Sequence, residues 1–260
     1  MGSATTQALA ASVSALGAAT VDLDTARELF AAARAVAGSP ALSGALADPA
    51  AAPEARSALV TRVFGSLSPT TQSLLTTAAA QRWSSQDELV DGIEELAIRS
   101  AAKADSGDLE GELFRVSRIV AENPELELAL GSRLGDGRAK GALMQTLLGG
   151  RTSEATTLVV SSLVQEPRGR RVRGILARAI RIVAAQRGRT VATVTTAAPL
   201  TADQTARLAT ALSRTYGGEV TISPVVDPSV VGGVRVQIAD DVIDGSIASR
   251  LADVRQKLAG

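Results

Sequence analysis

Histidine and cysteine are both absent from the 260 residues of this chain. Their absence excludes disulfides, zinc sites with Cys or His ligands, cysteine nucleophiles and Ser-His-Asp triads. It also removes the one side chain whose unperturbed pKa lies near neutral pH. An enzyme would have to work with carboxylates, lysine or tyrosine alone, so catalysis is the weakest functional hypothesis for this sequence.

Aromatic residues are scarce as well, at 2% of the chain, so its cores must be built from aliphatic side chains. The single tryptophan and the single tyrosine, Trp83 and Tyr216, are predicted to be packing anchors. Alanine occurs 48 times and favours helices. The 27 basic and 27 acidic residues balance, which gives no general reason to expect nucleic acid or an acidic membrane surface as the partner.

Long apolar runs are also missing. No stretch approaches the roughly 20 apolar residues that are needed to cross a bilayer. Residues 1–16 are apolar and rich in Ser and Thr, but they lack the basic start of a signal peptide. We therefore expect a cytosolic protein that reaches a membrane only through its partners.

Apolar residues recur at helical spacing through residues 1–189, as at Leu29, Ala33 and Val36. Glycine, serine and proline interrupt this pattern at 38–40, 49–53, 68–69 and 107. The sequence therefore predicts a series of helices of about three to five turns each, which suits a compact bundle.

The helical part repeats itself. When residues 28–74 are shifted by 84 positions onto 112–158, many identical residues align in one register without a gap. The aligned identities include Glu28-Leu29-Phe30 with Glu112-Leu113-Phe114, Arg34 with Arg118, Pro40 with Pro124, Ala58-Leu59 with Ala142-Leu143, and Gly65 with Gly149. This pattern predicts a duplicated helical bundle. The first repeat is expected at 1–104 and the second at 105–189, with the helix around 86–103 shared.

The pattern changes near residue 190, where strand-like alternation begins. Thr201 and Gln204 fit a capping box at the start of a helix. The expected elements are a strand at 190–197, a helix at 202–216, strands at 220–226 and 234–238, a short return at Val242-Ile243 after a turn at 239–241, and a helix from Ser246 to Leu258. The sequence therefore predicts an α+β protein: a mainly helical N-terminal region and a small α+β domain at 190–260.

One segment of this last domain resembles a known family. Residues 226–236 read Val-Asp-Pro-Ser-Val-Val-Gly-Gly-Val-Arg-Val, and 240–247 read Asp-Asp-Val-Ile-Asp-Gly-Ser-Ile. Together with 195–200 and 123–126, they resemble the delta subunits of F-type ATP synthases, whose mitochondrial counterpart is the oligomycin-sensitivity-conferring protein. The longer helical part resembles actinobacterial members. The signature residues are Asp227, Pro228, Gly232, Gly233, Arg235, Asp244, Gly245 and Ser246.

The resemblance implies a non-catalytic connector. In this family the helical domain binds N-terminal segments of the alpha subunits of the catalytic head, and the C-terminal domain binds b-type stalk subunits. The stalk then prevents the head from rotating with the rotor. The resemblance implies one copy per complex, at the cytoplasmic side of the bacterial cell membrane, with no cofactor, no metal, no catalytic residue and no nucleic acid partner.

Two features of the C-terminal part have an alternative explanation. Gly232-Gly233 could belong to a phosphate-binding loop, but the sequence has neither the P-loop Gly-Lys-Ser/Thr nor a G-x-G-x-x-G spacing. A bulge or close backbone approach at the start of a strand explains the pair better. The four carboxylates between 227 and 244 lack the EF-hand pattern of a calcium site, and turns and helix caps account for them.

Eight arginines between 168 and 189 form a basic run. A solvated helix face, docking to an acidic protein and nucleic acid binding each explain such a run. No aromatic residue lies within it to stack on bases, which counts against nucleic acid. The candidate docking residues are Arg168, Arg170, Arg171 and Arg173. The alternative to a stalk subunit is a stand-alone helical adaptor or nucleic-acid-binding protein that uses Arg168–Arg189.

Overall fold

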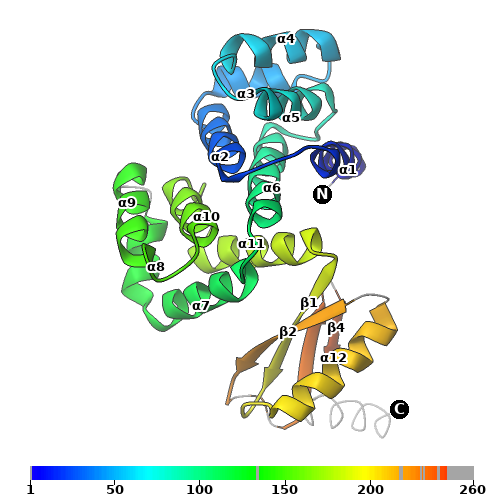
Figure 1. Cartoon of the computed structure of the whole chain (residues 1–260), viewed down its shortest axis with the longest axis vertical. Coiled ribbons are helices and arrows are strands. Elements are labelled where there is room, and N and C mark those ends of the chain that lie inside the picture. The colour runs from blue at the N-terminus through cyan, green and yellow to red at the C-terminus, as the bar shows by residue number, and fades with distance from the viewer. Residues whose placement is uncertain are drawn as a thin grey trace, which may run out of the picture. The chain divides into compact units, whose positions relative to one another are not determined.

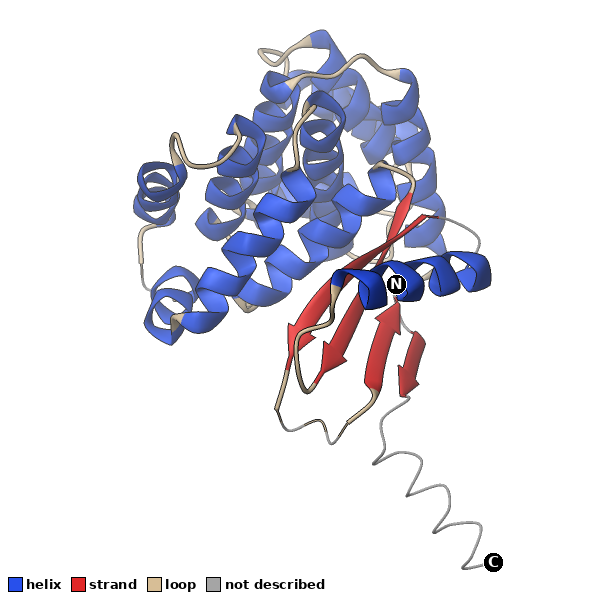
Figure 2. Ribbon diagram, turned by 60° about the horizontal axis from the view of Figure 1, so that its bottom comes forward, coloured by secondary structure: helices blue, strands red, loops and turns tan. Residues whose placement is uncertain are grey.

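The computed structural model describes residues 2–132, 135–216, 219–228, 230, 232–238 and 241–244. It divides into two compact units, Met1–Val183 and Ala184–Gly260. Figure 1 traces the helices of the first unit and the sheet of the second, and Figure 2 colours the same elements by type.

The first unit is helical. Its helices are α1 (Ser3–Ala18), α2 (Leu23–Ala37), α3 (Pro40–Ala47), α4 (Pro53–Val63), α5 (Pro69–Ala80), α6 (Gln86–Ala104), α7 (Leu109–Glu122), α8 (Pro124–Gly131), α9 (Gly137–Leu148), α10 (Glu154–Gln165) and α11 (Val172–Gln186), the last of which runs across the division between the units.

Serine caps and prolines set the starts of many of these helices. The hydroxyls of Ser39, Ser68, Ser85 and Ser153 each accept a hydrogen bond from the backbone N–H three residues later. Proline occupies the first position of α3, α4, α5 and α8, where its missing N–H costs nothing. The predicted breaks at 38–40, 49–53, 68–69 and 107 are confirmed. The structure adds connections at 81–85 and 166–171 that the sequence pattern does not predict.

A glutamate on α2 holds the start of α5. The Glu28 carboxylate accepts hydrogen bonds from the Ser68 N–H at 3.1 Å, the Ser68 hydroxyl at 2.6 Å and the Thr71 hydroxyl at 2.5 Å. Burial by itself raises the pKa of Glu28, but these bonds together lower it below its ordinary value of 4.5. The ionised carboxylate thus ties α2 to the N-terminal end of α5, where the helix dipole also favours negative charge.

The second repeat contains the same arrangement. The Glu112 carboxylate on α7 accepts hydrogen bonds from the Ser153 N–H at 2.8 Å and the Thr156 hydroxyl at 2.5 Å, at the start of α10. Burial raises the pKa of Glu112, and the bonds from Thr156 and Ser153 outweigh that effect and lower it. In each repeat, therefore, a carboxylate on one helix fixes the start of the helix three places later in the chain: α5 after α2, and α10 after α7.

These matching bonds correct the register of the repeat. Glu112 lies 84 positions after Glu28, but Ser153 lies 85 positions after Ser68. The gapless register predicted from the sequence is therefore wrong beyond Gly149, because Ser153 follows Gly149 by four positions, whereas Ser68 follows Gly65 by three. The recurring helix order and bonds support the predicted duplication, while the domain boundaries at 104 and 189 stay predictions.

Helix α6 is buried along most of its length, and α2 packs along it. The Trp83 side chain, 4% exposed, lies against the start of α6. A Cβ atom at Gly92 would lie 2.2 Å from Cη2 of this ring, so the helix can approach the indole only because residue 92 is glycine. The indole N–H donates to the Ala78 carbonyl at 2.8 Å. Trp83 is therefore a packing anchor, as predicted; the side chain of Tyr216 lies outside those that the structure describes.

The second unit contains one described sheet and one described helix. Its elements are β1 (Arg189–Thr196), α12 (Ala202–Tyr216), β2 (Glu219–Val226), β3 (Val234–Ile238) and β4 (Asp241–Asp244). The strand order is β2-β1-β3-β4. Strands β1 and β2 are parallel and joined through α12, whereas β3 pairs antiparallel with both β1 and β4.

Alternate residues of the strands form the core of this unit, as the period of two requires. Ala192 and Val194 of β1 pack with Val236 of β3 and with Leu212 of α12. The predicted capping box starts α12: the Thr201 N–H donates to the Gln204 side chain at 2.9 Å, and the Gln204 N–H donates to the Thr201 hydroxyl at 3.2 Å.

The predicted α+β class is confirmed by these elements. Asp241 is the first residue of β4, which corrects its prediction as part of the preceding turn. The expected helix from Ser246 to Leu258 lies outside the described residues.

No helix within the described ranges is by itself long and apolar enough to cross a membrane; α2 and α3, bent by 102°, meet both criteria only when taken together.

The two lowered glutamate pKa values predict an acid-sensitive contribution to stability. The folded pKa lies below the unfolded one, so the contribution is present above about pH 4.5 and is lost as the pH falls through the lowered pKa. We expect Glu28→Gln and Glu112→Gln each to reduce the free energy of unfolding at pH 7 by about 1–2 kcal/mol. Urea denaturation between pH 3 and 7 measures this, and the difference from the wild type should shrink at the acid end.

The exposed Glu54 provides the matched control. Glu54→Gln should stay within about 0.5 kcal/mol of the wild type at every pH, as surface substitutions generally do. A loss of stability at Glu28→Gln that does not change with pH would contradict the role assigned to the ionised carboxylate.

Candidate interaction interface

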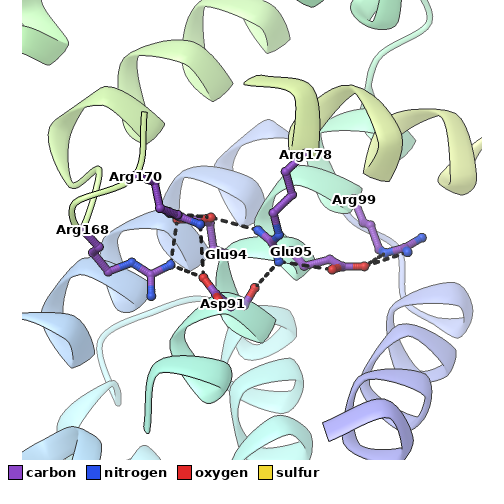
Figure 3. A network of polar contacts seen from close by, with 7 residues as sticks. All are labelled: Asp91, Glu94, Glu95, Arg99, Arg168, Arg170 and Arg178. Carbon is purple, nitrogen blue, oxygen red and sulfur yellow. Dashed lines mark hydrogen bonds and ion pairs between the residues drawn. The ribbon is translucent and has the colours of Figure 1, made fainter. Parts of the chain in front are cut away.

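Three carboxylates lie on one face of α6, at Asp91, Glu94 and Glu95 (Figure 3). Their spacing of three and four residues places them together on a helix. Glu94 and Glu95 are only 6% and 5% exposed. Burying two neighbouring carboxylates is costly unless they are paired with cations and hydrogen-bonded, so this face of α6 requires basic partners.

Arginines from the 166–178 segment supply those partners (Figure 3). Arg170 pairs with Asp91 at 3.2 Å and with Glu94 at 3.0 Å, and Arg178 pairs with Glu94 at 2.9 Å and Glu95 at 3.3 Å. Arg178 also donates to the Asp91 carbonyl at 3.0 Å. These bonds link α6 to the connection before α11 and to α11 itself.

Two further arginines complete the network. Arg168 pairs with Asp91 and, at 3.4 Å, with Glu94, while Arg99 pairs with Glu95 at 2.7 Å along α6. Four guanidinium groups thus meet three carboxylates, which leaves one formal positive charge in the network. The buried acids of α6 are therefore fully neutralised within the chain.

The connection between α10 and α11 is held in an unusual backbone conformation. Arg168 has a φ of 49° and Gly169 a φ of 76°, both in the left-handed region. For a side chain as large as that of Arg168 this conformation costs about 1–2 kcal/mol. The ion pairs of Arg168 with Asp91 and Glu94 offset that cost and hold the turn.

The network divides the predicted arginine run into two groups. Arg168 and Arg170 are 16% and 28% exposed and are used within the chain. Arg171 is exposed, and Arg173 is 48% exposed while its Nε pairs with Glu127 at 2.6 Å. Docking by the run therefore stays a prediction only for its outward members, Arg171 and Arg173. The acids on α6, 74 or more positions earlier, were missed, although their spacing among the buried apolar positions of that helix is a signal.

The family signature forms a loop across the end of β1. Thr196, the last residue of β1, pairs with Val226 on one side and Val234 on the other, so the loop at 227–233 must pass over this strand end. The Asp227 N–H donates to the Thr196 carbonyl at 2.9 Å. The Val230 N–H donates to the Asp227 carbonyl at 3.1 Å, which closes a turn with Pro228 at its second position.

Gly232 and Gly233 complete this loop. Their φ angles are 65° and 81°, in the left-handed region that glycine adopts without steric cost. The chain needs two such residues to return directly into β3 after crossing β1. The structure therefore gives these glycines an architectural explanation, which accounts for the pair without a bound phosphate.

The structure describes the positions of two further signature residues, Arg235 and Asp244. Arg235 lies opposite Asp244 in the ladder between β3 and β4. Gly245 and Ser246 lie outside the described residues. Among the side chains that the structure describes, no group of three or more acidic residues is arranged to hold a metal ion.

The chain is similar to proteins of one family along its whole length. The family described as "ATP synthase delta (OSCP) subunit" matches residues 96–258. The "ATP synthase subunit delta" of Leifsonia xyli subsp. xyli is 50% identical, and the alignment covers 100% of both chains. The protein of the same name from Streptomyces avermitilis is 44% identical over 82% of this chain and 81% of its own length.

One solved structure is also similar. A chain in the cryo-EM structure of the Toxoplasma gondii mitochondrial ATP synthase hexamer is 19% identical, with a TM-score of 0.43 over 64% of this chain and 96% of its own length. That likeness is too distant to add to the sequence relationship.

Removing one charge from the α6 network should be strongly destabilising. Glu94→Gln leaves arginines without their shared carboxylate in a buried place, so we expect a loss of about 3 kcal/mol in the free energy of unfolding. Glu122→Gln is the matched control, because its pair with Arg118 is more than 60% exposed on both sides. That variant should change stability by less than about 1 kcal/mol. Chemical denaturation measures the free energy of unfolding of both variants. Equal losses would show that burial of the Glu94 ion pairs does not increase their contribution to stability.

Replacing Gly233 by valine should destabilise the second unit. A β-branched residue at a φ of 81° is strained, and we expect a cost of about 1–3 kcal/mol. The control is Gly17→Val, since Gly17 is exposed in α1 with no atom within 4 Å of an added Cβ. Thermal unfolding of the full chain measures both. An unchanged midpoint for Gly233→Val would show that the loop does not need this conformation.

Proposed function

This chain belongs to the ATP synthase delta (OSCP) subunit family, and we propose that it links the catalytic head of an F-type ATP synthase to the peripheral stalk. Delta subunits are structural components of the ATP synthase and not themselves catalytic. The proposed role is to hold the head against the torque of the central rotor, with the alpha subunits and the b-type stalk subunits as the two partners.

The observation that carries this proposal is the full-length relationship to the Leifsonia protein. An alignment that covers 100% of both chains at 50% identity includes the first helical repeat as well as the signature region. The extended helical part is therefore shared with a protein named as a delta subunit. This argues against a stand-alone adaptor that merely carries a delta-like domain.

The physical properties of the chain suit a connector. A protein that resists torque needs helices that do not slide past one another, and the buried ion pairs fix α6 to the segment that leads into α11. The α6 acids pair with three of the eight arginines of the run, which reduces the positive charge left for nucleic acid. This favours the stalk role over the nucleic-acid alternative.

The second unit offers apolar surface for a stalk helix. Exposed apolar side chains lie on both edge strands of its sheet, where a partner can cover them. They are Val225 and Val226 on β2, and Val242 and Ile243 on β4, each 40–47% exposed. We assign the stalk contact to this unit and the head contact to the helical unit. The complex places the chain at the membrane, on the cytoplasmic side, through these partners.

Truncation tests the proposed division of labour. A tagged chain that ends at Gly188, between α11 and β1, keeps the helical unit and removes the sheet. When it is expressed in cells of the source organism and purified in mild detergent, we expect it to retain the head subunits and to lose the b-type subunits. The full chain should retain both sets, because it contacts each through a separate unit.

Two outcomes would count against the proposal in different ways. If the full chain does not co-purify with ATP synthase subunits, the stalk function itself is wrong. If the truncated chain still retains the b-type subunits without the head, the stalk contact lies in the helical unit and the assignment of the two partners must be reversed.

A further inference from the structure

A groove of about 380 Å³ lies between α8 and the start of α11. The most exposed large apolar side chain among those described, that of Leu128, lines it and is 75% exposed. The same groove contains three of the four arginines that the sequence marks as docking candidates. Its apolar members are Pro124, Leu128 and Val172, and its basic members are Arg170, Arg171 and Arg173.

The first repeat has a groove at the equivalent place, between α3 and the start of α6. Here Gly44 stands where the second repeat has Leu128, and Asp87 stands where it has Arg173. Two aspartates give this groove a formal charge of −2, whereas three arginines and one glutamate give the other a formal charge of +2. The two repeats thus share the groove and differ in its chemistry.

The residue that precedes the helix also differs between the repeats: it is Ser85 before α6 and Arg171 before α11. In the first repeat Ser85 caps α6 and accepts a hydrogen bond from the Glu88 N–H. In the second repeat the equivalent residue is Arg171, whose carbonyl accepts the first bond of α11 from Ile175. An arginine cannot cap a helix start, and its charge opposes the helix dipole there. Arg171 therefore weakens α11 locally, which fits a residue kept for contact with another molecule.

Ion pairs within the chain hold two of the three arginine side chains of the groove in place. Arg170 is fixed by Asp91 and Glu94, and Arg173 is fixed against the groove wall by Glu127. Arg173 remains 48% exposed, and no described carboxylate pairs with Arg171. Both arginines therefore present positive charge beside Leu128, and Arg173, held by Glu127, has less side-chain freedom to lose on binding.

We infer that the groove between α8 and α11 docks an acidic amphipathic helix of a partner protein. An apolar residue of that helix lies on Leu128 and Pro124, and carboxylates on its flank pair with Arg171 and Arg173. The cleft between two helices suits this mode of binding, in which apolar anchors provide affinity and charges fix the register. The first-repeat groove, with its aspartates and no leucine, rejects the same helix.

This inference adds a defined surface and ligand chemistry that the proposed stalk function does not specify. It concerns the second repeat alone and holds whichever complex contains the chain. The full chain in cells of its source organism is therefore the material for the test, and co-purification with ATP synthase is recorded separately from docking.

Site-specific cross-linking tests the groove. Leu128 is replaced by the photo-reactive amino acid p-benzoylphenylalanine, which is apolar and fits an exposed position. After irradiation of intact cells, mass spectrometry identifies the partner segment joined to residue 128. We expect a single protein segment with apolar residues at helical spacing and flanking Asp or Glu. The same probe at Leu143 on α9, 44% exposed and outside the groove, should not join that segment.

Charge reversal then tests the electrostatic part. Added to the probe at residue 128, Arg171→Glu should reduce the yield of that product about tenfold, since like charges then meet across the contact. The variant should not unfold α11, because a carboxylate is favoured at a helix start. Arg181→Glu, at an exposed position of the same helix outside the groove, should leave the yield unchanged.

Several results would overturn the inference. These are the absence of a product at residue 128, a product with a second copy of this chain, with lipid or with nucleic acid, a partner segment without acidic residues, or a yield insensitive to Arg171→Glu. If the chain co-purifies with ATP synthase in such a case, the stalk function stands and only the groove assignment fails.

Discussion

The buried carboxylates of α6 impose the constraint on which the helical unit depends. Glu94 and Glu95 are buried within the helical unit, where an unpaired charge would be very costly. Arginines must therefore reach them from the segment before α11 and from α11 itself, and this requirement sets the left-handed turn at Arg168 and the placement of α11. The same turn separates inward arginines from outward ones, so the candidate groove is a consequence of the buried pairs.

The helical unit contains one set of helix-start contacts twice, as the predicted duplication requires, while the two grooves differ. A glutamate holds the start of α5 in one copy and of α10 in the other, by the same hydroxyl and amide donors. The grooves beside α3 and α8 are formed by equivalent helices of the two repeats and carry opposite formal charges. The contacts that hold the helix starts recur in both parts, whereas the exposed side chains of the two grooves do not.

The proposed connector role needs no reactive group, and the composition is compatible with it. The absence of His and Cys, the aliphatic cores and the balanced charge are all compatible with a chain whose output is mechanical. The glycines of the family signature serve the same end. They let the chain pass over the end of β1 and return into β3, which closes the sheet that we assign to stalk binding.

The α+β class, the strands at 190–197, 220–226 and 234–238 and the family could be predicted from the sequence, because periodicity, caps and a signature loop are local patterns. The sequence also identified Gly232-Gly233 and the arginine run. It did not determine which arginines face inward, because their acidic partners lie 74 or more positions away and only packing brings them together. It also placed the repeat one residue out of register beyond Gly149, since a loop insertion leaves no periodic trace. Tertiary structure decided these points because ion pairing and burial depend on distances between distant segments, which a linear pattern does not contain.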